Sequence, residues 1–159
     1  MEIKNNCLNN IIMEYPKVND SDFYQFINKK FSKFKIPKEN KSLEEFCFPE
    51  KYQLQIPQKF LSEFINPNTP YKGLLVFHQI GSGKTCTAIS IAENFKKIKK
   101  VIIVVPASLK GNFRSELRSQ CADDTYLSAK ERGLLKILKP SSEEYQKIIE
   151  KSDAKIDEY

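Results

Sequence analysis

The spacing of apolar residues predicts helices in the N-terminal part of the chain. Within residues 22–34, "DFYQFINKKFSKF", five apolar residues recur near helical spacing, and Asp20 or Ser21 can cap the start of the helix. We interpret its aromatic face as a packing surface rather than a platform for stacking bases. A short amphipathic helix is predicted from Gln58 to Ile65, and "NPNTP" ends it because proline and asparagine favour turns.

Two continuous apolar runs interrupt this helical pattern. They are "GLLVF" at residues 73–77 and "VIIVV" at residues 101–105. Such short runs are typical of strands buried on both faces of a sheet. Between them, Thr85 to about Lys97 has helical periodicity. A strand, a helix and a strand in this order predict a βαβ unit, so the two strands should be parallel.

A loop and a helix are predicted in residues 108–121, and two further helices in residues 128–138 and 141–151. Ser128 with Glu131 and Ser141 with Glu144 have the spacing of capping boxes at the starts of the last two. A third short strand is predicted in "TYL", at residues 125–127.

Positive charge is concentrated in the middle of the chain. The formal net charge is +6. Residues 51–120 hold eleven Lys or Arg against three acidic residues, whereas residues 1–50 are balanced and residues 121–159 have a small acidic excess. A basic segment of this kind favours phosphate-bearing partners, either nucleotides or nucleic acids.

The cysteines and the apolar content indicate an intracellular, reducing environment. Cys7, Cys47, Cys86 and Cys121 form no CxxC pair, so we expect free thiols rather than a zinc site. No apolar run approaches the roughly 20 residues of a membrane span, and the N-terminus lacks the features of a secretory signal. We therefore expect no membrane partner.

The stretch "GSGKT", Gly81 to Thr85, carries the candidate chemistry. Glycines allow a sharp turn that points backbone N–H groups at an anion, and the following helix contributes the positive end of its dipole. Lys84 can reach the β- and γ-phosphates of ATP, and the Thr85 hydroxyl can ligate Mg²⁺. Gly81, Ser82, Gly83, Lys84 and Thr85 are therefore the predicted ATP-binding residues, with Thr85 as the metal ligand.

Two neighbours of this loop have alternative interpretations. His78 occupies the position of the first glycine in the G-x-x-x-x-G-K-[ST] pattern, and we interpret this lone histidine as structural rather than catalytic. Cys86 lies in the first turn of the predicted helix. It is either a thiol of lowered pKa or a small residue that packs behind the loop.

With these motifs in order, residues 52–121 resemble the superfamily 2 helicases and NTPases of large nucleocytoplasmic DNA viruses, including the helicase-like subunit of the poxvirus early transcription factor. Gly81 to Thr85 match helicase motif I. Motif Ia, which contacts the nucleic-acid backbone in such helicases, matches Pro106, Ala107, Ser108, Leu109 and Lys110 in this chain. Gln58 lies near the place of the adenine-reading glutamine, and a solvent-facing glutamine is the alternative.

The resemblance implies an α/β P-loop NTPase fold. Residues 51–159 would be the N-terminal part of a RecA-like domain 1 with parallel strands. For residues 1–50, the sequence pattern itself predicts a mostly helical extension with loops. Motif II, an Asp-Glu pair at the end of a buried strand, is not recognisable at Asp123-Asp124 or at Asp157-Glu158. We therefore expect the domain to be truncated before motif II, and the catalytic residues stay unknown.

The resemblance implies the ATP-binding N-terminal part of a viral DEAD/DEAH-like helicase or nucleic-acid-dependent ATPase that acts in viral transcription. Its cofactors would be ATP and Mg²⁺. Its partners would be DNA or RNA and the viral transcription machinery, in the host cytoplasm or the virion. Lys110, Arg114 and Arg118 would add phosphate contacts. The alternative is a short nucleotide-binding or interaction module without turnover. A nucleotide kinase fits less well, because it needs arginine-rich lid and substrate segments. The only arginines of this chain are Arg114, Arg118 and Arg132.

Overall fold

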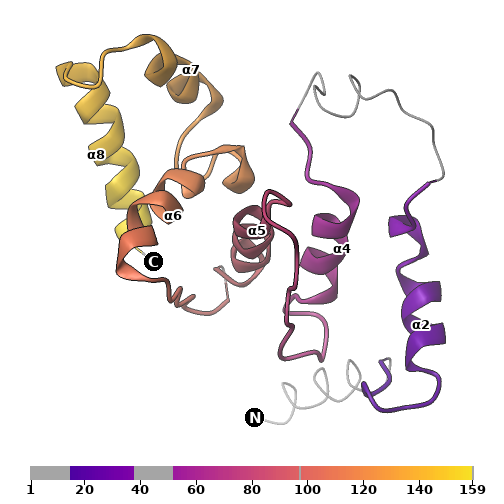
Figure 1. The fold of residues 1–159 in the computed structure, drawn as a ribbon. Helices are drawn as coiled ribbons and strands as arrows, with labels where there is room; N and C mark the ends of the chain where they lie inside the picture. Colours follow the sequence, from indigo (N-terminus) through magenta and orange to yellow (C-terminus); the bar gives the residue numbers. More distant parts are fainter. Residues whose placement is uncertain (1–14, 38–51, 97, 159) are drawn as a thin grey trace. The chain divides into compact units, whose positions relative to one another are not determined.

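All regular structure in residues 15–37, 52–96 and 98–158, which the computed structural model describes, is helical (Figure 1). The chain divides into two units, Met1–Val76 and Phe77–Tyr159. The first unit contains α2 (Phe23–Lys30), η1 (Ser32–Phe34) and α4 (Ile56–Phe64). The second contains α5 (Lys84–Lys96), η2 (Ala107–Leu109), α6 (Lys110–Leu117), η3 (Gln120–Ala122), α7 (Ala129–Ile137) and α8 (Glu143–Asp157).

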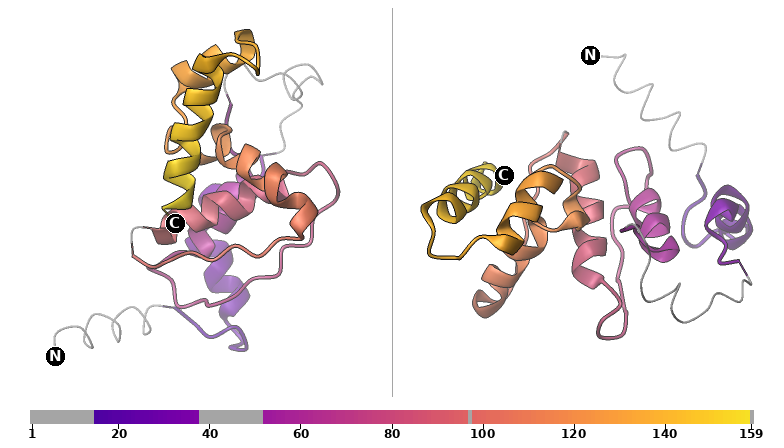
Figure 2. Two further views of the ribbon diagram at one scale, coloured as in Figure 1. Left: turned by 90° about the vertical axis from the view of Figure 1, so that its left-hand side faces the viewer. Right: turned by 90° about the horizontal axis from the view of Figure 1, so that it is seen from above.

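The predicted α/β fold with parallel strands is wrong for the described residues, which contain no strand. Both views of Figure 2 draw the two apolar runs as plain coil, and residues 125–127 are likewise not a strand. Leu75 is 89% exposed and Val104 is 90% exposed, so neither run is buried on two faces. A strand needs backbone hydrogen bonds to a neighbouring strand. An apolar run favours extended backbone but does not supply that neighbour.

The first unit is held together by aromatic rings. Phe31 is buried at the end of α2, and its ring lies edge-on to Phe60 of α4, with centroids 5.4 Å apart. Phe64 stacks on Tyr71 at 4.6 Å, and the Tyr71 hydroxyl donates a hydrogen bond to the carbonyl of Pro16. Burial raises the pKa of Tyr71. The interpretation of these aromatic residues as a packing surface is therefore confirmed.

The second unit has a small hydrophobic core, to which α5 contributes a buried side chain. Its buried members come from α5, α6, α8 and the segment around η3: Ile89, Leu117, Ala122, Tyr126 and Ile156. Ile89 has no exposed surface, as the helical periodicity predicted. Tyr126 also fixes the far end of α5, because its hydroxyl donates to Glu93 Oε1 at 2.7 Å and Lys96 Nζ lies 4.5 Å from its ring centroid. The core thus holds the middle and the C-terminal part of α5.

Most helix starts agree with the sequence pattern within two residues. The capping box of α7 is confirmed: Ser128 N–H donates to Glu131 Oε2 at 2.9 Å, and Glu131 N–H donates to Ser128 Oγ. The second predicted box is wrong, because Ser142 rather than Ser141 caps α8 and accepts from Tyr145 N–H. This register places two glutamates in the first turn, where the helix dipole favours negative charge.

Two of the four cysteines are not free thiols. Cys86 in α5 and Cys121 in η3 form a disulfide across 35 residues of sequence. The expectation of free thiols is therefore wrong for this pair, and Cys7 and Cys47 lie outside the described residues. Linear spacing could not reveal the pairing, because it is the packing of α5 against η3 that brings the two Cα atoms to 5.1 Å.

No helix within the described ranges combines the length and the apolar character that a bilayer crossing requires.

The cap of α7 predicts a pH dependence of stability. Hydrogen bonds from Ser128 and then Lys151 lower the pKa of Glu131 from its ordinary 4.5 to about 2. A depressed carboxyl pKa contributes stability above the unfolded value, and this contribution disappears as the pH falls from 4.5 towards 2. Glu131→Gln should lower the free energy of unfolding by about 1 kcal/mol at pH 7 and flatten this acid-side slope.

Urea denaturation followed by circular dichroism between pH 2 and 7 tests this prediction. The matched control is Glu150→Gln, because Glu150 is exposed within α8. Equal slopes in the wild type and in Glu131→Gln would contradict the role of this cap.

Candidate functional site

The glycines of the predicted phosphate loop adopt a backbone that other residues rarely reach. Gly81 has a φ of 83° and Gly83 a φ of 76°, both in the left-handed region. Helix α5 begins at the next residue, Lys84. The turn and the helix that the motif requires are therefore both present, whereas the preceding strand is not. Any side chain at Gly81 or Gly83 would strain this turn.

The side chain of Lys84 folds over its own loop. Its Nζ donates to the carbonyl oxygen of Gln79 at 2.8 Å and to that of His78 at 3.3 Å. Ser82 Oγ also donates to the Gln79 carbonyl, at 2.8 Å. These bonds close the loop on itself, while Lys84 remains exposed to solvent. Because these hydrogen bonds are exposed to solvent, the Lys84 ammonium group can exchange them for an anionic ligand at a small cost in free energy.

Hydrogen bonds in the first turn of α5 stabilise the loop that precedes it. Thr85, the predicted metal ligand, is half-buried in the first turn. Thr87 is buried, and its Oγ1 and its N–H both donate to the Gly83 carbonyl, at 3.1 and 3.0 Å. Sequence reasoning missed Thr87, although a hydroxyl four residues after the second glycine was the available signal. This bond fixes the peptide that joins the loop to the helix.

These residues fit a magnesium–nucleotide complex. The N-terminus of a 13-residue helix, two left-handed glycines and an exposed ammonium group together favour an anion. Thr85 Oγ1 is the hydroxyl that would ligate Mg²⁺. Within the described residues no group of three or more His, Cys, Asp or Glu side chains could hold a metal by itself.

His78 and Gln58, the other two residues considered for a functional role, belong to different units of the chain. His78 is half-buried, and its Nδ1 has no hydrogen-bond partner among the described residues. Gln58 is buried in the first unit, where its Oε1 accepts from Gln55 N–H at 2.8 Å at the start of α4. The solvent-facing alternative for Gln58 is therefore wrong, and adenine reading stays a prediction.

The predicted motif Ia residues lie together on the surface of the second unit. Ala107, Ser108 and Leu109 form η2, closed by a 2.9 Å hydrogen bond from Leu109 N–H to the Pro106 carbonyl, and Lys110 opens α6. All five residues of Pro106–Lys110 are exposed. The segment thus has an accessible backbone and one cation at a helix start, and nucleic-acid contact there stays a prediction.

Two arginines expected near motif Ia face inward instead. Arg114 Nη2 lies 2.8 Å from Asp153 Oδ1, and Arg114 Nη1 lies 2.7 Å from Asp157 Oδ1. Arg118 also pairs with Asp153. The hydrogen bonds that Arg114 donates to Asp157 and Asp153 raise the pKa of Arg114, and its guanidinium in turn lowers the pKa of Asp157. The acids of α8 therefore neutralise much of the charge that the sequence assigned to the surface of α6.

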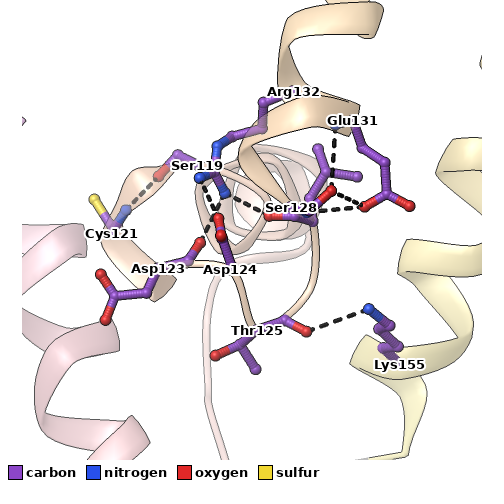
Figure 3. A network of polar contacts seen from close by, with 10 residues as sticks. Ser119, Cys121, Asp123, Asp124, Thr125, Ser128, Glu131, Arg132 and Lys155 are labelled. Atoms are coloured by element: carbon purple, nitrogen blue, oxygen red, sulfur yellow. Dashed lines mark hydrogen bonds and ion pairs between the residues drawn. The ribbon is translucent and has the colours of Figure 1, made fainter.

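A third arginine organises the segment after η3 (Figure 3). Arg132 of α7 pairs with Asp124 Oδ1 at 2.6 Å and donates to the carbonyl oxygens of Asp123 and Leu127. Asp123 follows η3 with a φ of 49°. Asp123-Asp124 therefore lies in an arginine-bound turn and not at a strand end, which agrees with its rejection as motif II.

A left-handed glycine turn that leads into a helix at an exposed lysine is the arrangement of a phosphate-binding loop. Residues 47–156 match the family described as the res subunit of type III restriction enzymes. Because this match covers more than half of the chain, the chain belongs to that family of helicase domains.

Similar proteins come from large DNA viruses. The chain is 65% identical over 147 residues to a protein of Acanthamoeba polyphaga mimivirus named "Putative ATP-dependent RNA helicase R563", covering 92% of this chain and 26% of that protein. It is 33% identical to "Putative helicase 087L" of Invertebrate iridescent virus 3, covering 64% and 11%. It is 31% identical to the "Termination factor NPH-I homolog" of African swine fever virus, covering 50% and 9%.

The predicted resemblance to helicases of large DNA viruses is therefore confirmed. The chain spans about a quarter of the first relative and about a tenth of the other two. No solved structure matches it.

Arg114 and Arg118 share the carboxylate of Asp153, so its removal should lower the stability of the second unit substantially. Asp153→Asn should lower the free energy of unfolding of the second unit by about 1–3 kcal/mol, because it weakens charge-assisted bonds to two half-buried guanidinium groups. Urea denaturation monitored by circular dichroism measures this change.

Glu150→Gln is the matched control, since it removes an exposed carboxylate within α8 that lies away from the first turn of the helix. Its effect should stay below about 0.5 kcal/mol. Similar losses in both variants would show that the Asp153 cluster has no special role.

Proposed function

We propose that this chain is an ATP-binding segment of a viral ATP-dependent helicase or nucleic-acid-dependent ATPase. The observation that carries the proposal is the turn at Gly81 and Gly83 that presents Lys84 and the start of α5. Membership of a helicase-domain family and similarity to viral proteins named as helicases support it.

Each loop residue has a role in this proposal. Gly81, Ser82 and Gly83 would offer backbone N–H groups to the phosphates, and Lys84 would exchange its bonds to the His78 and Gln79 carbonyls for the β- and γ-phosphates. Thr85 would hold Mg²⁺, which supplies charge neutralisation when bound. Thr87 would keep the peptide of Gly83 in place.

The same proposal gives the exposed segment Pro106–Lys110 a role in contacting the nucleic-acid backbone. Its exposure and the cation at the start of α6 suit a sequence-independent contact with phosphates of DNA or RNA. We infer a role in viral transcription, in the infected cell or in the virion, because one relative is named a termination factor homolog.

Lys84 is the first test of nucleotide binding. Lys84→Ala should raise the Kd for a fluorescent Mg²⁺-ATP analogue at least about tenfold, because a charge-assisted bond to phosphate contributes about 1.5–3 kcal/mol. Lys99→Ala is the matched control, because Lys99 is an exposed lysine beyond the end of α5. Fluorescence anisotropy gives both values, and an unchanged Kd in Lys84→Ala would refute the proposal.

Salt dependence tests the nucleic-acid contact. Lys110→Ala should weaken binding of a single-stranded oligonucleotide and reduce the magnitude of the slope of log K against log salt by about 0.7, the value for one lost phosphate contact. Lys147→Ala is the control, because Lys147 is a lysine of α8 paired with Glu143. Parallel slopes for the wild type and Lys110→Ala would exclude Lys110 from the contact.

A further inference from the structure

A covalent bond joins the candidate nucleotide loop to the body of the second unit. Cys86 lies two residues after Lys84, in the first turn of α5, and its disulfide partner Cys121 lies in η3. Cys86 is buried, whereas Cys121 is half-buried. The bond therefore ties the residues that would receive the phosphates to the segment that carries part of the core.

The two ends of α5 are attached in different ways. Near its C-terminus, Tyr126 holds Glu93 and Lys96, and in the middle of the helix Ile89 fills the core. Before its N-terminus, Phe77 is 93% exposed and Ile80 is fully exposed, so these residues do not anchor the loop. The disulfide is thus the covalent anchor at the end of α5 that carries Lys84 and Thr85.

We propose that Cys86 and Cys121 form a redox modification site that sets the nucleotide affinity of the loop. The inference rests on the nucleotide binding proposed above. The oxidised pair holds the first turn of α5 against η3, so less conformational freedom is lost when the phosphates bind. After reduction the terminal turn can fray, and ordering it opposes binding.

The chemistry is a two-electron thiol–disulfide exchange. A small dithiol attacks as its thiolate at Sγ of Cys121, which is the more exposed of the two residues. The disulfide bond breaks, Cys86 leaves as a thiolate and takes up a proton, and a mixed disulfide forms at Cys121. The second thiol of the reductant then releases Cys121 as a thiol, and the reductant ends as its own disulfide. Oxidised glutathione reverses the process and becomes two reduced thiols.

The experiment isolates this pair by replacing the other two cysteines. In a Cys7→Ser, Cys47→Ser background, the chain is equilibrated with oxidised glutathione or with dithiothreitol. Thiols are then counted by mass spectrometry after alkylation, and the Kd for the fluorescent Mg²⁺-ATP analogue is measured in each state. We expect a Kd about three to ten times lower in the oxidised state. We also expect the helical circular dichroism to be retained in the reduced state, apart from the small decrease that fraying of one turn of α5 causes.

Three variants separate the switch from the binding site itself. Cys86→Ser and, independently, Cys121→Ser should bind the analogue in both buffers with the weaker affinity expected for the reduced chain. Lys84→Ala should raise the Kd at least about tenfold in both. Binding that depends on Lys84 but not on redox state would overturn the switch alone. Binding that is independent of Lys84 would overturn the proposed function as well.

Two other results would also overturn the switch. One is failure of the pair to oxidise with glutathione disulfide. The other is loss of most of the helical signal on reduction, because the bond would then act only as a structural crosslink.

Discussion

The candidate site depends on how α5 is fixed in the second unit. Its first turn carries Lys84 and Thr85, so every contact proposed for a nucleotide follows the orientation of this one helix. Three attachments set that orientation: the disulfide at Cys86, the fully buried Ile89, and Tyr126 with its bonds near the last turn. Because the core is small, losing one attachment affects the remaining ones directly.

Charge in this unit is arranged by tertiary contacts rather than by position along the chain. The basic middle of the sequence suggested one positive surface around the phosphate loop. In the structure, acids of α8 fold back onto α6 and bind Arg114 and Arg118, while Arg132 binds the turn after η3. Half-buried pairs of this kind are shielded from salt more than exposed lysines are. The cations that remain outside, such as Lys110, are therefore the ones that can meet a partner.

The redox state of the Cys86–Cys121 pair depends on the chemical surroundings of the protein. Bond formation needs an oxidant, and a cell interior rich in reduced glutathione opposes it. Oxidising and reducing surroundings therefore favour different states of this pair. A disulfide between a phosphate loop and its support would make the loop responsive to that difference.

The sequence alone determined several features of this protein, namely those that depend on interactions between residues close together in the chain. Helices followed from apolar periodicity, the start of α7 from the Ser128–Glu131 box, and the left-handed turn from Gly81 and Gly83, because each depends on residues within a few positions. Only the tertiary structure decided the disulfide, the arginine pairs and the absence of strands from the described residues. Each of these depends on which distant segment lies opposite, and neither spacing nor composition contains that information.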